Sequence, residues 1–103
     1  MATRRPERTE RRARERAARR LVRDRERLAR LSPGGSADHP IEVDSPAVIE
    51  GRAASLRCPQ CDGEYTVDEH RSAGPGLRVV AVKCRTCRVA RELWFRLGSS
   101  APS

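Results

Sequence analysis

Alternation of apolar and polar positions is clearest in the C-terminal half of the chain. Residues 64–70, 77–83 and 89–97 alternate or run apolar over strand-like lengths, and residues 71–76 form a stretch rich in glycine and small side chains. Alternation with a period of two is typical of half-buried β-strands, and such a stretch is typical of a loop. The pattern therefore predicts three strands in a small domain at residues 57–97.

The last predicted strand has two distinct faces. One face holds apolar side chains at alternate positions and is assigned to the core, although Arg91 interrupts it. The opposite face holds Trp94 and Arg96, so both are expected to point outward. Alternatively, Trp94 packs beneath the preceding linker, as large aromatic side chains commonly do. The core-face residues are Val89, Leu93, Phe95 and Leu97.

A helical pattern covers residues 1–31. This stretch has no glycine and, after Pro6, no proline, and Thr3 is a candidate N-cap. Ser-Pro-Gly-Gly at residues 32–35 ends the helix. The apolar stripe is thin and confined to the second half, which could dock on a partner or dimerise, whereas the first half is expected to be solvated. The stripe comprises Ala17, Leu21, Leu28 and Leu31.

The segments around the predicted domain are polar. Residues 32–56 are predicted to be a flexible acidic linker, because turn-forming residues dominate its start and acids outnumber bases in it. Within it, Ile41 and Val43 alternate with polar residues, which predicts a short extended segment along the edge of the sheet. Residues 98–103 are predicted to be a disordered tail.

The net charge of +8 is unevenly distributed. Residues 1–31 contain thirteen arginines and five acids, whereas the remainder of the chain is balanced at nine of each sign. No apolar run approaches 18 residues, so no membrane span and no membrane partner are expected. The arginine-rich start lacks the apolar region of a secretory signal, so a reducing cytoplasm is the expected location.

The four cysteines form two Cys-x-x-Cys pairs, separated by twenty-two residues. Four thiolates at this spacing suit one tetrahedral Zn²⁺ ion, and in a reducing compartment such pairs serve metal binding or redox chemistry more often than disulfides. A zinc ion held by four thiolates has no open coordination position, so its expected role is structural. The candidate ligands are Cys58, Cys61, Cys84 and Cys87.

These pairs resemble the knuckles of the zinc-ribbon group, here of a bacterial type. The first pair has the form Cys-Pro-x-Cys-x-Gly, and strand-like segments lie between and after the pairs. The resemblance covers roughly residues 55–97 and implies a three-stranded antiparallel zinc ribbon, which the sequence joins to a long N-terminal Arg-rich α-helix. Gly63 would allow a tight reversal in the first knuckle, possibly with positive φ. The second knuckle has Val89 at that position, so a differently built turn is expected there.

The expected function is non-enzymatic binding of nucleic acid or a nucleoprotein. Arginines on every side of a helix can neutralise phosphates, and an exposed tryptophan beside an arginine can stack on a base. A solvated tail is the bland interpretation of the charge. A protein–protein adaptor that uses Trp94 and the leucine stripe is the alternative function; no nucleophile–base set or small-molecule substrate is expected. The candidate nucleic-acid contacts are Arg11, Arg12, Arg16, Arg19, Arg20, Arg23, Trp94 and Arg96.

Overall fold

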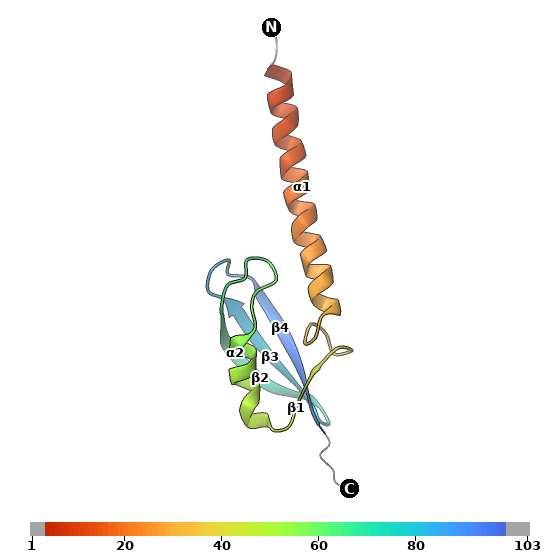
Figure 1. Cartoon of the computed structure of the whole chain (residues 1–103), viewed down its shortest axis with the longest axis vertical. Helices are drawn as coiled ribbons and strands as arrows, with labels where there is room; N and C mark the ends of the chain where they lie inside the picture. Colours follow the sequence, from red (N-terminus) through yellow and green to blue (C-terminus); the bar gives the residue numbers. More distant parts are fainter. Residues whose placement is uncertain (1–3, 99–103) are drawn as a thin grey trace.

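A computed structural model of the chain describes residues 4–98 (Figure 1). The elements are α1 (Arg4–Leu31), β1 (Ile41–Val43), a 3-10 turn η1 (Pro46–Val48), α2 (Ile49–Ser55), β2 (Tyr65–Gly74), β3 (Leu77–Cys84) and β4 (Ala90–Leu97). Thr3, the expected N-cap, and residues 99–103 of the expected disordered tail lie outside the described residues. The N-terminal helix and the strands of the C-terminal half are confirmed.

The sheet has four strands in the order β1-β4-β3-β2. The strands β2, β3 and β4 are antiparallel, as expected, whereas β1 is parallel to β4, with Ile41 opposite Phe95. The prediction of a three-stranded, purely antiparallel ribbon is therefore wrong in strand count and in direction. The reason is that both apolar residues of β1 are buried, and they bury best by completing the outer edge of β4.

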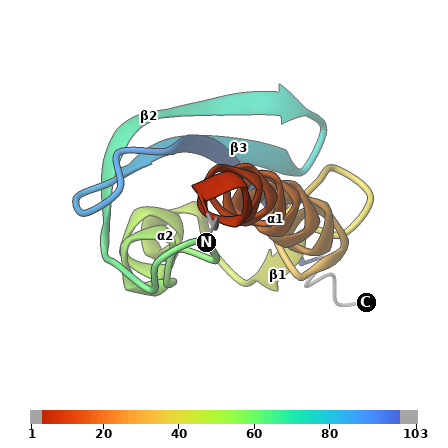
Figure 2. The same cartoon turned by 90° about the horizontal axis from the view of Figure 1, so that it is seen from above.

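The segment between β1 and β2 contains a helix that the sequence pattern did not predict. Ser45 Oγ accepts a hydrogen bond from the N–H of Ala47 at 3.1 Å and caps η1, which leads directly into α2. Ile49 and Ala53, one helical turn apart, are fully buried against the sheet. Figure 2 shows α2 covering one side of β2 and β3. Tertiary burial therefore stabilises a helix whose seven residues would be marginal alone.

The core lies between α2 and one face of the sheet. Phe95, Val80 and Val82 are essentially inaccessible to solvent, and Leu93 is nearly so. The assignment of the Leu93 and Phe95 face of β4 to the core is therefore confirmed. The strand β2 is longer than expected, because residues 71–74 continue the ladder with β3 instead of forming a loop. Gly76, at φ +68°, makes the tight turn that leaves room for this extension.

The helix α1 extends away from the sheet domain, and the molecule measures 77 × 23 × 17 Å along its principal axes (Figure 1). Residues 7–25 are all exposed. At its end, Gly35 packs so closely on the last turn that a Cβ atom there would lie 1.7 Å from the carbonyl oxygen of Ala29. This glycine lets the chain turn back toward β1. Within residues 4–98, no helix combines the length and apolar character that a membrane span requires.

Candidate metal centre

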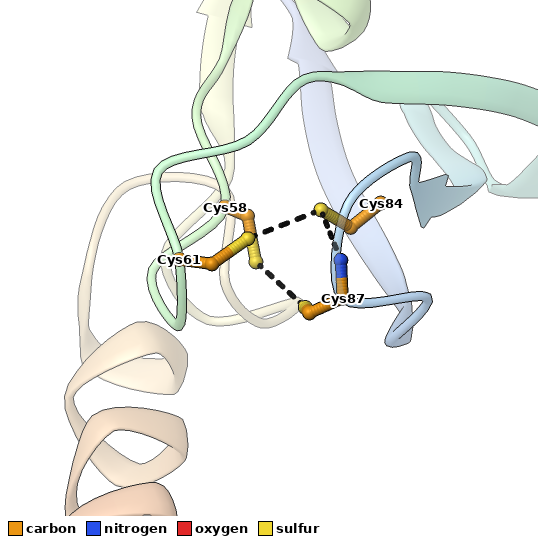
Figure 3. A group of neighbouring side chains, drawn as sticks. All are labelled: Cys58, Cys61, Cys84 and Cys87. Carbon is orange, nitrogen blue, oxygen red and sulfur yellow. Dashed lines mark hydrogen bonds between the residues drawn. The ribbon is translucent and has the colours of Figure 1, made fainter.

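The four cysteines come together at one end of the sheet (Figure 3). Cys58 and Cys61 lie in the loop before β2, Cys84 ends β3 and Cys87 follows it. All four sulfur atoms lie within 4.8 Å of one another, with 3.7 Å between Cys58 and Cys87 and 3.4 Å between Cys61 and Cys84. A tetrahedron with bonds of about 2.3 Å to a central metal ion has edges of about 3.8 Å. The sulfur atoms are thus positioned to hold a metal ion.

The two knuckles have the same backbone conformation. In each, the residue after the second cysteine is left-handed: Asp62 at φ 63° and Arg88 at φ 68°. The expectation of a differently built second turn is therefore wrong. The reversal occurs one residue earlier than expected, so Val89 never needs positive φ. The matching backbone hydrogen bonds are Cys58 N–H to Gly63 O (3.0 Å), Asp62 N–H to Cys58 O (2.7 Å), Cys84 N–H to Val89 O (2.9 Å) and Arg88 N–H to Cys84 O (3.1 Å).

Gly63 has a different role from the one expected, because its φ is not positive. A Cβ atom at this position would lie 2.8 Å from Thr86 Oγ1 and 2.9 Å from Cys84 Sγ. Real Cβ atoms do not approach other atoms so closely, and these two belong to the opposite knuckle. Gly63 therefore lets the two knuckles approach each other, which brings their sulfur atoms within reach of one ion.

Backbone N–H groups favour the thiolate form in the knuckles. The N–H groups of Cys87 and Thr86 donate to Cys84 Sγ at 3.5 and 3.3 Å, and that of Gln60 donates to Cys58 Sγ at 3.4 Å. The hydrogen bond from Cys87, with that from Thr86, lowers the pKa of Cys84 to about 6. The hydrogen bond with Cys84 raises the pKa of Cys61 to about 12, so this pair holds one proton that a bound metal ion would displace.

Tyr65 is buried next to Cys58 of the cysteine cluster. The residue is only 3% exposed, and its hydroxyl oxygen has no hydrogen-bond partner among the described residues. Burial raises the pKa of Tyr65 to about 12, with the neighbouring Cys58 adding to the shift, so the hydroxyl keeps its proton. A ligand thiolate is an acceptor that suits this orphaned donor, because buried polar groups are normally paired. The surroundings thus fit a metal ion held by four thiolates.

The helix α1 is attached to the first knuckle by Gln60, the residue before Cys61. Gln60 Nε2 donates to the carbonyl oxygen of Val22 at 2.9 Å and to Glu26 Oε2 at 2.7 Å. In return, Arg25 Nη1 donates to the carbonyl oxygen of Gln60 at 2.9 Å. The helix α1 is therefore held by Gln60, which lies in the chain between the candidate ligands Cys58 and Cys61.

An ion pair between Glu26 and Arg91 completes the attachment. Arg91 donates twice, at 2.9 and 2.6 Å, and its side chain is 11% exposed against 31% for Glu26. The hydrogen bond from Arg91 lowers the pKa of Glu26, although burial opposes the shift. Paired geometry of this kind gives the strongest charge-assisted contacts. We call the four residues Arg25, Glu26, Gln60 and Arg91 the helix latch.

Sequence reasoning did not find the latch. The one available signal was Arg91, an arginine that interrupts an otherwise apolar face of β4. A charge at such a position calls for a partner, because buried charges are rarely unpaired. Nothing in the sequence pointed to Glu26, on a helix far away in the chain, or to Gln60.

The candidate nucleic-acid contacts fall in two separate places. Arg96 and the six candidate arginines of α1 are exposed, but Arg96 lies on β4 and the others on the extended helix (Figure 1). Trp94 is half-buried, and its backbone N–H donates to the carbonyl oxygen of Gly34 at 2.8 Å. It therefore lies beside the turn after α1. The helix residues are Arg11, Arg12, Arg16, Arg19, Arg20 and Arg23.

Comparison with known proteins finds no relative of this chain. No model of a known protein family matches the chain, and neither a curated protein nor a solved structure matches it. A function is therefore inferred from the metal centre, the latch and the exposed helix. These three features are local to the chain and can each be altered by single substitutions.

Proposed function

We propose that the chain is a zinc-ribbon protein with one structural Zn²⁺ ion. Four thiolates whose sulfur atoms lie within 4.8 Å of one another favour zinc over harder ions, which prefer oxygen ligands. The first knuckle has the Cys-Pro-x-Cys-x-Gly form of the ribbon group. The parallel β1 strand and α2 are additions to the ribbon that enlarge its core. The bound ion would supply a cross-link between the knuckles and, with four thiolates, no site for water activation.

The proposed activity is non-enzymatic attachment to nucleic acid or a nucleoprotein. The observation that carries it is the exposure of α1: residues 7–25 are uncovered. An arm with cations on all sides can follow a phosphate backbone and release its counterions. A cytoplasmic location belongs to the proposal, because reduced thiolates are needed for the centre.

A protein–protein adaptor is the second candidate, favoured by one specific observation. Three leucines on the second half of α1 are exposed: Leu21 by 48%, Leu28 by 65% and Leu31 by 62%. Exposed leucines on one helix can be an interface. Here they lie among arginines, so a protein partner would need an acidic face.

The deciding experiment measures binding of the metal-loaded full chain to generic RNA and DNA over a salt series. We expect a steep salt slope, reduced in the triple variant Arg12→Gln, Arg16→Gln, Arg19→Gln by about 0.9 for each lost phosphate contact on duplex DNA. Negligible binding near physiological salt would refute nucleic-acid attachment. The charge-matched control replaces three exposed cations of the sheet domain, Arg52, Lys83 and Arg85, with glutamine and should retain the slope. Equal losses in both variants would also count against the arm.

A further inference from the structure

A cavity of about 510 Å³ lies between the last turns of α1 and the edge of β4. Its remaining walls come from the turn at residues 32–35, the segment at residues 56–59 and Tyr65. This volume is in the range of small-ligand sites, which extend from roughly 300 to 1,000 Å³. The metal centre and the exposed arm do not account for the cavity.

The cavity runs along the edge of β4. Five consecutive residues, 90–94, line it, and consecutive strand residues point to opposite faces, so the shared element is the strand edge itself. The strand β1 covers only residues 95–97 of this edge. The backbone N–H of Trp94 points to Gly34, away from β3. In an antiparallel ladder every second residue points its N–H and C=O to the same side, so the backbone N–H and C=O of Glu92 also point away from β3. Neither group has a hydrogen-bond partner among the described residues.

Both ends of this open edge are closed. At one end, Trp94 donates its N–H to Gly34, and at the other the ion pair of Glu26 with Arg91 joins the helix to the strand. Only the backbone of Glu92 remains free between these contacts, which is too short a stretch for an added peptide strand. The opening suits a compact group that presents one acceptor and one donor.

The side chains around the opening define that group further. The apolar lining includes Trp94, Leu93 and Leu56. Arg30 and Arg57 also line it and are exposed; Arg57 Nη1 donates to the carbonyl oxygen of Asp62 at 3.3 Å, and its other N–H groups can meet an anion. The two lining carboxylates, Glu26 and Glu92, are each paired with an arginine. An aromatic ring, an edge donor–acceptor pair and two cations match a planar heterocycle that carries phosphate.

We propose that this cavity binds the base of a nucleotide, with Trp94 as the stacking platform, the Glu92 backbone as the reader of the base edge and Arg30 and Arg57 as phosphate contacts. This site deepens the proposed function. It rests on that function in one respect only, namely whether the bound base belongs to a nucleic-acid strand or to a free nucleotide. An unpaired nucleotide of a strand held by α1 and a free nucleotide offer the same chemistry. A base locked in a duplex offers no free face and is excluded.

The test uses Trp94 as its own reporter, because it is the only tryptophan in the chain. The metal-loaded full chain is titrated with the four nucleoside monophosphates, with a short single-stranded oligonucleotide and with its duplex. We expect saturable quenching of Trp94 fluorescence by the first two and none by the duplex. Tighter binding of the strand than of the monophosphates identifies the strand as the source, and equal binding identifies the free nucleotide. Absence of saturable quenching, or equal quenching by the duplex, overturns the proposal.

Two variants separate the cavity from the arm. Ala29→Phe, in the wall formed by α1, fills the cavity and should weaken binding of the monophosphates by about tenfold or more, measured calorimetrically, while duplex binding persists. Ala54→Phe, at an exposed position of α2 that does not line the cavity, is the matched control and should leave the quenching unchanged. Unaltered monophosphate binding in folded Ala29→Phe refutes the site. Quenching by the monophosphates, with strand and duplex binding unaltered in the triple arginine variant, would instead refute the arm and leave the cavity standing.

Discussion

The sheet domain and α1 belong to one chain but are held in different ways. Apolar residues of α2 and of one sheet face are buried together, and the cysteine cluster lies at the end of this core. The helix α1 buries little apolar surface, and Leu28 remains 65% exposed. Its position depends on the polar contacts of the helix latch. The fold of one region and the placement of the other can therefore be disturbed separately.

This difference assigns separate tasks to the two regions. A domain of this size has a small core and gains much of its stability from a bound metal. Polar contacts with specific geometry add less free energy than a bound metal ion, but they fix the orientation of the element that they hold. The latch joins the two regions through the loop that carries Cys58 and Cys61, so α1 is placed by a part of the domain that a bound metal ion would order.

Metal removal is expected to have the largest effect. Zinc contributes on the order of 10–16 kcal/mol of apparent binding free energy in small zinc domains, so a strong chelator should unfold the sheet domain. Because α1 contributes much of the helical signal, the loss is measured by Trp94 fluorescence and amide dispersion in NMR spectra. Added Zn²⁺ should restore both signals, and spectra unchanged by complete chelation would contradict a structural metal.

The replacement Gly63→Ala should have the next largest effect. The new Cβ would clash with Thr86 and Cys84 in the opposite knuckle, forcing the sulfur atoms apart and lowering the affinity for metal. Competition with a chromophoric chelator measures the change. The matched control is Gly51→Ala in α2, where a Cβ meets nothing within 4 Å and helix propensity should raise stability by up to about 1 kcal/mol. Similar affinities in the two variants would refute the close-approach role.

Loss of the latch should have a moderate effect and act on one region only. Glu26→Ala leaves the nearly buried Arg91 without its partner, which costs about 3–5 kcal/mol for a fully buried pair and less here, since Glu26 is 31% exposed. We expect α1 to detach while the sheet domain keeps its amide dispersion. Chemical shifts of the Gln60 side-chain amide report the change, and Glu15→Ala on the exposed part of α1 is the control. A helix that stays docked would show that other contacts place it.

The latch should also depend on pH in one direction. The pKa of Glu26 is lowered by Arg91, so its contribution is complete above the unfolded pKa of about 4.3 and is lost as pH falls through the lower folded value. In Glu26→Gln this acid-side loss should disappear from the shifts of the Gln60 amide. The two proteins should therefore differ most near neutral pH and converge as Glu26 is protonated, so a difference that grows as the pH falls would have the wrong sign.

Neutralising the outer arginines should alter stability least. The arginines at positions 12, 16 and 19 are fully in solvent, and surface substitutions usually change stability by about 0.5 kcal/mol or less. Thermal unfolding of the triple glutamine variant should thus match that of the parent, while its nucleic-acid binding weakens. A large fall in the unfolding temperature would mean that the arm supports the fold.

Features encoded by local sequence could be predicted. The helix α1, three strands and the four metal-ligand candidates follow from breaker positions, alternation and Cys-x-x-Cys spacing. The helix α2 and the parallel pairing of β1 could not be predicted, because Ile49 and Ile41 become informative only when the sheet they cover is in place. The contacts of Glu26 with Gln60 and Arg91 span 34 and 65 residues, beyond the range of any local pattern.

The length of α1 makes its attachment a lever. The latch holds the helix near Glu26, and about 33 Å of helix lies beyond it at 1.5 Å per residue. A rotation of about 10° at the latch displaces the far end by about 6 Å, nearly twice the rise of about 3.4 Å along the DNA axis per phosphate of one strand. Changes of a fraction of an ångström in the loop around Gln60 are therefore magnified at the tip of the arm.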